Sequence, residues 1–84
     1  MEVYLGQVLL LGFDYVPPGF AFCEGQVMDI AGHPALFGLI GDRFGGDGVD
    51  TFALPDLRGK EPADGLRYAI ALDGMIVRTS ASLA

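Results

Sequence analysis

TFALPDLRG, residues 51–59, decides how the rest of the chain is interpreted. Its apolar run ends at Pro55, which has no N–H for strand pairing, so a short strand stops there. Asp56 follows in a position suited to accept backbone N–H bonds in a turn that Gly59 closes. These residue types predict a corner of the backbone.

The remaining two residues of this stretch also fit a corner. Leu57 can return to the hydrophobic core, and Arg58 can reach Asp56, another carboxylate or a carbonyl of a neighbouring chain. A structural corner therefore explains every residue here, whereas a catalytic loop explains only the acid and the base. The predicted corner consists of Pro55, Asp56, Leu57, Arg58 and Gly59.

The composition indicates one small domain with more apolar surface than it can bury. The chain has 84 residues, of which 51% are hydrophobic, and a domain of this size buries only a modest fraction of its surface. The longest apolar runs, such as Val8–Phe13, are far shorter than the roughly 20 residues that span a bilayer. We therefore expect no membrane insertion and a protein partner, most simply further copies of the chain.

The charges and the single cysteine exclude further classes. The chain has 11 acidic and 5 basic residues, a net charge of −6, and its basic residues form no run, which argues against nucleic-acid binding. Cys23 has no partner for a disulfide within the chain. The first residues, MEVYLGQ, lack the basic start of a secretory signal, so we expect the product in the cytoplasm until lysis or assembly into a particle.

Turn residues divide the first third of the chain into short strands. Glu2–Phe13 is apolar on both faces, which predicts a buried strand. Pro17-Pro18-Gly19 then predicts a type II turn, because glycine accepts the positive φ that this turn requires. In residues 20–30, two short strands flank Glu24-Gly25, which predicts a tight hairpin.

One helix and one further strand are expected in the rest of the chain. Pro34 fits the first turn of a helix over Pro34–Arg43, with Gly41 or Gly45 as the C-terminal cap. Residues 45–50 are a loop by composition. Residues 65–74 alternate between large apolar side chains and small or charged ones, as in a strand. The fold class predicted from these elements is a small α+β domain.

Catalytic and metal-binding interpretations each have a simpler rival. Cys23 and His33 could act as nucleophile and base, but no third group orients them, and a free cysteine in an apolar segment is usually packed in the core. Asp42, Asp47 and Asp50 surround a glycine-rich loop, but their spacing does not match a calcium-binding loop. We therefore predict no catalytic residue, no metal site and no cofactor.

Three stretches together resemble a known family. PPGFAFCEGQVMDI, ALFGLIGDRFGGDGVDTFALPDLRG and LRYAIALDG, read in this order, are similar to the phage tail collar domain, found in short tail fibres of phages and in microcystin-dependent proteins of bacteria. The similarity extends over about residues 6–74. It implies a small α+β module of the virion tail that assembles as a trimer, with other tail proteins as partners and no catalysis.

The resemblance gives the apolar surplus a place at contacts between subunits. The candidate interface residues are Leu36, Phe37, Ile40, Tyr68 and Ile70. Family members commonly carry a long insertion between the corner and the closing strand that forms the receptor-facing part, whereas only residues 60–65 intervene here. From this sequence we also expect a module that begins at the collar itself, without a fibrous shaft ahead of it.

A second function class remains open beside the structural one. An adhesin or carbohydrate-binding module would contact a host surface glycan through its loops, with exposed aromatic side chains and nearby polar groups. The candidate residues for such binding are Tyr15, Asp47 and Asp50. Host attachment would then accompany, or replace, the role in assembly.

Overall fold

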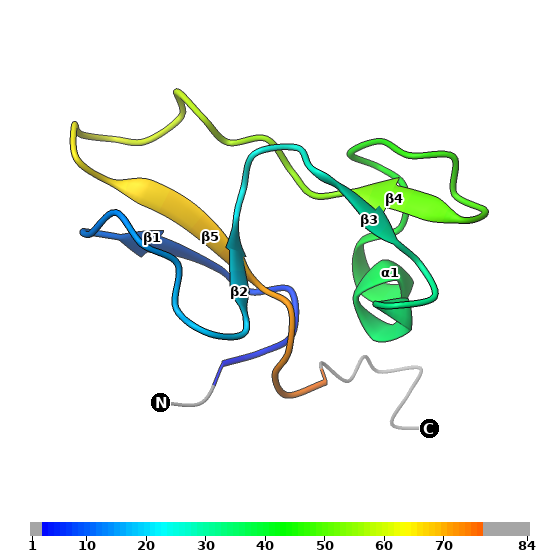
Figure 1. Ribbon diagram of the computed structural model, residues 1–84. Helices are drawn as coiled ribbons and strands as arrows, with labels where there is room; N and C mark the ends of the chain where they lie inside the picture. Colours follow the sequence, from blue (N-terminus) through cyan, green and yellow to red (C-terminus); the bar gives the residue numbers. More distant parts are fainter. Residues whose placement is uncertain (1–2, 77–84) are drawn as a thin grey trace, which may run out of the picture.

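Residues 3–76, the part of the chain that the computed structural model describes, contain two antiparallel sheets and one helix joined by long turns and loops (Figure 1). The larger sheet has the strand order β1-β5-β2, and the smaller sheet pairs β3 with β4. The elements are β1 (Val8–Leu11), β2 (Phe20–Phe22), β3 (Val27–Asp29), α1 (Pro34–Ile40), β4 (Thr51–Ala53) and β5 (Arg67–Ala71). The predicted α+β class is confirmed.

The strand predicted over residues 65–74 is present as the shorter β5 (Arg67–Ala71), and it lies at the centre of the larger sheet. Tyr68 and Ile70 face the side that carries the core, and Ile70 is fully buried. Ala69 and Ala71 face the other side and are also buried, because their partners in β1 and β2 are larger. The small side chains of Ala69 and Ala71 therefore lie between larger side chains of the two neighbouring strands, such as Leu9 and Phe22.

Strand β1 is shorter and more exposed than predicted. The expected buried strand Glu2–Phe13 was wrong: β1 covers only Val8–Leu11 and lies at the edge of the sheet, and Glu2 falls outside the described residues. A turn causes the difference, since the Gln7 N–H donates to the Tyr4 carbonyl at 3.0 Å and Gly6 takes φ +80°. This turn ends the preceding extended segment before β1 begins.

The proline-rich turn forms as predicted. The Phe20 N–H donates to the Pro17 carbonyl at 3.1 Å, and Gly19 has φ +83°, which is the third position of a type II turn. The turn delivers the chain into β2, at the edge of the sheet opposite β1.

The predicted hairpin around Glu24-Gly25 was wrong. Gly25 does take a positive φ, but β2 pairs with β5 and β3 pairs with β4, so the segment crosses from one sheet to the other (Figure 1). Gln26 explains this path: its Nε2 donates to the Phe22 carbonyl at 2.8 Å and its Oε1 accepts from the Glu24 N–H at 3.1 Å. The side chain thus satisfies groups that a hairpin would have used.

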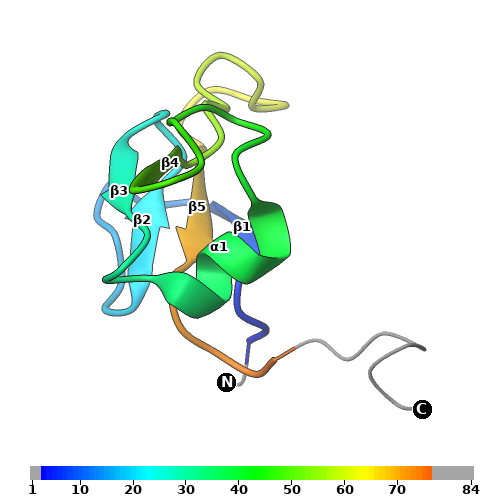
Figure 2. The same cartoon turned by 90° about the vertical axis from the view of Figure 1, so that its right-hand side faces the viewer.

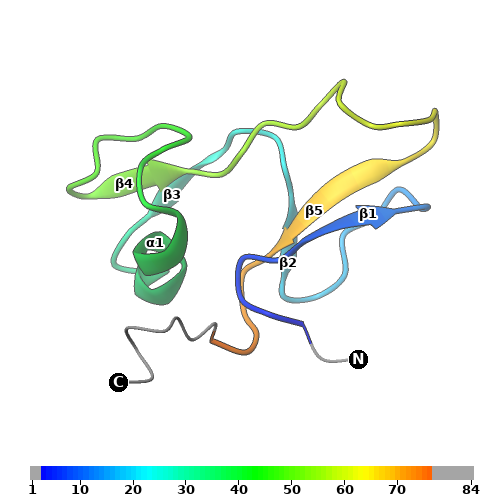
Figure 3. The same cartoon turned by 180° about the vertical axis from the view of Figure 1, so that it is seen from behind.

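Helix α1 begins at Pro34 as predicted and ends sooner than predicted. Its cap is Gly41, with φ +61° and an N–H that donates to the Phe37 carbonyl at 2.8 Å. Because this glycine leaves the helical conformation, the helix stops at Ile40 and does not reach Arg43. Figure 2 shows α1 facing the viewer, and Figure 3 shows it beneath the β3–β4 sheet.

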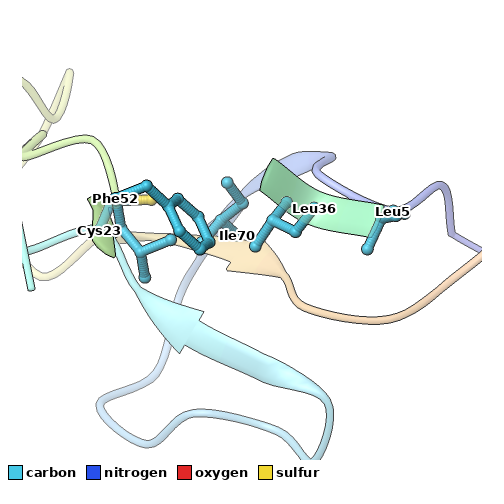
Figure 4. Close-up of a cluster of buried hydrophobic side chains, with 6 residues drawn as sticks. Leu5, Cys23, Leu36, Phe52 and Ile70 are labelled. Atoms are coloured by element: carbon cyan, nitrogen blue, oxygen red, sulfur yellow. The ribbon is translucent and has the colours of Figure 1, made fainter. Parts of the chain in front are cut away.

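The core joins both sheets to the helix. Figure 4 shows side chains of this cluster, which come from α1, β4, β5 and the segments next to β1 and β2. The Phe52 ring also lies 5.5 Å from the Phe37 ring, centroid to centroid, in a tilted arrangement that aromatic pairs favour. The buried residues of the cluster are Leu5, Cys23, Leu36, Phe52, Leu54 and Ile70.

The glycine-rich loop between α1 and β4 lies directly on the backbone of β4. Gly46 has φ +86°, and a Cβ at this position would stand 2.7 Å from the Thr51 carbonyl oxygen and 2.8 Å from the Phe52 nitrogen. The Ala53 N–H also donates to the Gly45 carbonyl at 3.0 Å. Only glycine fits this approach of two backbone segments.

Replacing Gly46 with alanine should therefore destabilise the fold. We expect Gly46→Ala to lower the free energy of unfolding by about 2–4 kcal/mol, since it adds both a clash and a strained φ. Gly38→Ala is the matched control, because Gly38 lies in α1 with no atom within 4 Å of its added Cβ. Urea unfolding monitored by circular dichroism measures both variants, and equal stabilities would contradict the close packing.

Candidate functional site

The predicted corner is closed by a two-pronged ion pair. The Arg58 Nε donates to Asp56 Oδ1 at 2.9 Å, and its Nη2 donates to Asp56 Oδ2 at 2.8 Å. The Arg58 backbone N–H donates to the same Oδ1 at 3.2 Å. Of the three partners that the sequence left open for Arg58, the structure selects Asp56.

The corner is also bonded to the turn that follows β2. The Leu57 N–H donates to the Cys23 carbonyl at 2.9 Å, and the Gly25 N–H donates to the Pro55 carbonyl at 3.3 Å. An added Cβ on Gly25 would meet the Asp56 Cβ at 3.3 Å, so a glycine is needed where the two segments touch. Two of the sequence stretches that carry the family resemblance thus lie against one another.

The other corner residues divide between the core and the surface. Pro55 is buried and Leu57 packs against the core cluster, while Gly59 is exposed with φ +82°. The Gly59 N–H donates to Glu61 Oε1 at 2.9 Å. The polar groups of the corner bond to the chain itself, so this arrangement can hold the backbone in place and has no evident reacting group.

Asp47 plays the same part in the glycine-rich loop. Its Oδ1 accepts the backbone N–H groups of Thr51, Val49 and Asp50 at 3.0, 2.8 and 2.9 Å. These bonds favour the ionised carboxylate, and they lower the pKa of Asp47 to about 2. The Asp50 carbonyl accepts from the Ile30 N–H at 3.0 Å. Within residues 3–76, no three acidic, histidine or cysteine side chains gather closely enough to hold a metal.

Cys23 and His33 do not form a nucleophile and base in the described residues. Cys23 lies in the core, and this burial raises the pKa of its thiol to about 11, so the reactive thiolate is scarce at neutral pH. His33 precedes α1 without a side-chain capping bond. No hydrogen bond joins the two side chains in the part of the chain that the structure describes.

The five candidate interface residues do not share one exposed surface. Leu36 and Ile70 are each only 1% exposed and belong to the core of their own chain, so these two candidates need correction. Phe37, Ile40 and Tyr68 are half-buried and pack against the same core. The alternation and the helical spacing identified apolar faces correctly, but the single chain itself covers part of them.

Sequence reasoning missed a clamp formed by Arg67. Its Nη1 donates to Asp14 Oδ1 and its Nη2 to Glu24 Oε2, both at 2.7 Å, and its guanidinium carbon lies 3.6 Å from the centre of the Phe22 ring. The clamp ties the loop after β1 and the turn after β2 to β5.

The loop between β1 and β2 presents a stacked aromatic pair. The Phe13 and Tyr15 rings lie 4.6 Å apart at an interplanar angle of 30°, and Tyr15 is 68% exposed. An open cleft of about 370 Å³ lies farther along this segment, lined on one side by Pro18 and Phe20 and on the other by Asp73 and Met75. Tyr15 had been predicted as a binding residue, and Phe13 had not.

These features define a small structural domain whose characteristic motifs build turns and close backbone contacts. Residues 6–62 match the phage tail collar domain family, and the chain belongs to this family. The matched residues run from just before β1 through the corner, so the closing strand β5 lies beyond them. No curated protein matches the chain.

Membership of the family identifies the chain as a structural module of the phage tail fibre type. The family is a structural one, and it suggests a location in the virion tail. Among the described residues, no helix has the length and apolar character needed to span a bilayer.

Acid should weaken the two turns that Asp47 and Asp56 stabilise. The side-chain bonds from Arg58 lower the pKa of Asp56 to about 2, as the backbone bonds do for Asp47, against an ordinary value of 3.8. A lowered folded-state pKa adds stability above the ordinary value, and this stability is lost as the pH falls towards 2. We therefore expect the melting temperature to drop across this interval.

A double variant isolates this contribution. Compared with the wild type, Asp47→Asn with Asp56→Asn should melt at lower temperature near neutral pH, and the difference should shrink as the pH approaches 2. Asp64→Asn is the control, since Asp64 is exposed and makes no side-chain bond within residues 3–76. Thermal unfolding across this pH range tests the expectation, and a constant difference at every pH would contradict it.

Proposed function

We propose that the chain is a single collar-type module, residues 1–84 with its core at about 6–74, that assembles as a homotrimer in a phage tail fibre or phage-derived particle. Other tail proteins are its proposed partners. The observation that carries this proposal is the apolar surface left on an otherwise acidic chain. Exposed large hydrophobic side chains include Tyr4, Val8, Leu10, Tyr15, Val27, Phe44, Val49 and Ile76.

Such a surface favours association. Isolated exposed apolar side chains are ordinary, but so many on a chain of 84 residues leave extensive apolar area in water. Burial of that area between copies would be favourable in proportion to its extent. The half-buried Phe37, Ile40 and Tyr68 can contribute at the margins of such a contact, and threefold symmetry follows from the family resemblance.

The solution mass tests the assembly. We expect light scattering to give a mass of three chains, or a multiple of three, for a chain of 8.9 kDa, and we expect this mass to persist on dilution. Apolar contacts across a closed ring should resist dilution better than a loose association. A mass of one or two chains at every concentration would contradict the threefold assembly.

The aromatic pair of the loop favours a second function, a carbohydrate-binding adhesin. Phe13 and Tyr15 present ring surface to solvent, and the Asp14 side chain between them in sequence is 86% exposed while Arg67 holds its position. Flat aromatic faces with hydrogen-bonding groups beside them suit the apolar face and the hydroxyl groups of a sugar ring. A host surface glycan is the proposed ligand in this case.

A glycan array with two tyrosine variants tests the adhesin. We expect saturable binding by the wild type and its loss in Tyr15→Ala, because this change removes the more exposed ring of the pair. Tyr4→Ala is the matched control, since Tyr4 is also exposed but lies before β1. An array without binding, or equal binding by both variants, would contradict the adhesin.

A further inference from the structure

The outer edge of β1 presents unpaired backbone groups. On one side of β5, the Tyr68 carbonyl accepts the Cys23 N–H just after β2. On the other side, the Ala71 N–H donates to the Gln7 carbonyl, so this carbonyl just before β1 points towards β5. The backbone groups of successive strand residues alternate in direction. The N–H and C=O groups of Val8 and Leu10 therefore point away from β5, and no group within residues 3–76 bonds to them.

The opposite edge of the sheet is closed by its own chain. On β2, the Phe20 N–H donates to the Pro17 carbonyl at 3.1 Å. The Phe22 carbonyl accepts from Gln26 Nε2 at 2.8 Å and from the Glu24 N–H at 3.1 Å. The turns before and after β2 thus occupy groups that another strand would need, and β1 has no such protection among the described residues.

The side chains of β1 also lack the usual devices against edge pairing. Natural edge strands are commonly protected by charged residues, prolines or bulges. Residues 3–13 contain no charged residue and no proline, and Val8 and Leu10 are each 40% exposed. Figure 3 shows β1 in front of β5, on the outside of the sheet.

We propose that β1 pairs with β1 of a second copy of this chain, antiparallel and around a twofold axis that passes beside Leu9. In this register, Val8 of each copy lies opposite Leu10 of the other. Each of these pairs exchanges two N–H to C=O hydrogen bonds, which uses all four outward groups of each strand. The two sheets then become one sheet of six strands.

The sequence of β1 is complementary to itself in this arrangement. Val8 and Leu10 form two apolar cross-strand pairs, which stabilise a sheet. Gln7 lies opposite Leu11, and Gly6 opposite Gly12, so no like charges meet across the axis. This matters for a chain of net charge −6, because most other surfaces would bring acidic residues together. A second copy is therefore the occupant that this edge fits.

The twofold contact buries Val8 and Leu10, so the threefold contact proposed above must use the other exposed apolar residues where both contacts form. If both contacts form, the assembly is a hexamer of two trimers. If only the twofold contact forms, the assembly is a dimer. The number of chains therefore distinguishes the two proposals. A mass of six chains supports both, two chains supports only the twofold contact, three supports only the threefold contact, and one contradicts both.

Light scattering of an edge variant tests the pairing. We expect the wild type to contain an even number of chains and Leu10→Lys to have half the wild-type mass, because a lysine on an edge strand opposes pairing. Val27→Lys is the matched control in β3, where the side chain is also exposed, and it should keep an even number of chains. Thermal unfolding checks that both variants fold.

A cysteine at the axis gives an independent readout. Leu9 of one copy lies opposite Leu9 of the other in a pair without direct hydrogen bonds, where Cα atoms are about 4.5 Å apart, within disulfide range. We expect Leu9→Cys to form covalent dimers on oxidation and Val27→Cys to form far fewer. An odd number of chains for the wild type, or equal cross-linking by the two cysteine variants, would overturn the proposal.

Discussion

The contact between the corner and the turn after β2 determines the path of the whole chain. Two backbone bonds, from Leu57 to Cys23 and from Leu54 to Gln26, join segments about thirty residues apart. The Gln26 side chain closes the turn after β2, and the chain then passes out of the larger sheet. As a result, β3 pairs with β4 in the smaller sheet. The corner then returns the chain from β4 towards β5.

This arrangement lets a small chain build one core from two small sheets. The smaller sheet has only two strands, which are marginally stable alone, and α1 is only seven residues long. Phe52 enters the core from β4, and Leu54 enters it from the position between β4 and the corner. Both join Leu36 and Ile70 there. Local bonds fix the loops around this core: Asp47 holds three backbone N–H groups, and Asp56 holds Arg58.

Local chemistry was predictable from the sequence where one or two residues decide the conformation. The type II turn at Pro17–Phe20, the helix start at Pro34 and the strand β5 all follow from such signals. The corner at Pro55–Gly59 belongs here too, although the sequence left three partners open for Arg58 and only the structure shows its pair with Asp56.

The predictions that failed depended on contacts between distant segments. Glu24-Gly25 had the residues of a hairpin, but pairing with β4 and β5 determined where β2 and β3 lie. Likewise, the apolar spacing of Leu36 and Ile70 indicated a buried face and did not indicate which chain buries it. The clamp from Arg67 to Asp14 spans 53 residues, a separation at which no local pattern specifies a partner.

The charge distribution adds a constraint on how such a chain associates. A net charge of −6 makes most approaches between two copies repulsive, so association is favoured where charge is absent. The segment of residues 3–13 is uncharged, and its strand β1 carries outward backbone groups without a partner in residues 3–76. On β2, the Phe20 N–H and the Phe22 carbonyl are instead bonded within the chain by the turns before and after this strand. Backbone hydrogen bonds have fixed directions, whereas apolar contacts alone do not, so an exposed strand edge supplies an orientation that the rest of the apolar surface lacks. Apolar area and an open edge therefore have different consequences: the first favours association, and the second determines its geometry.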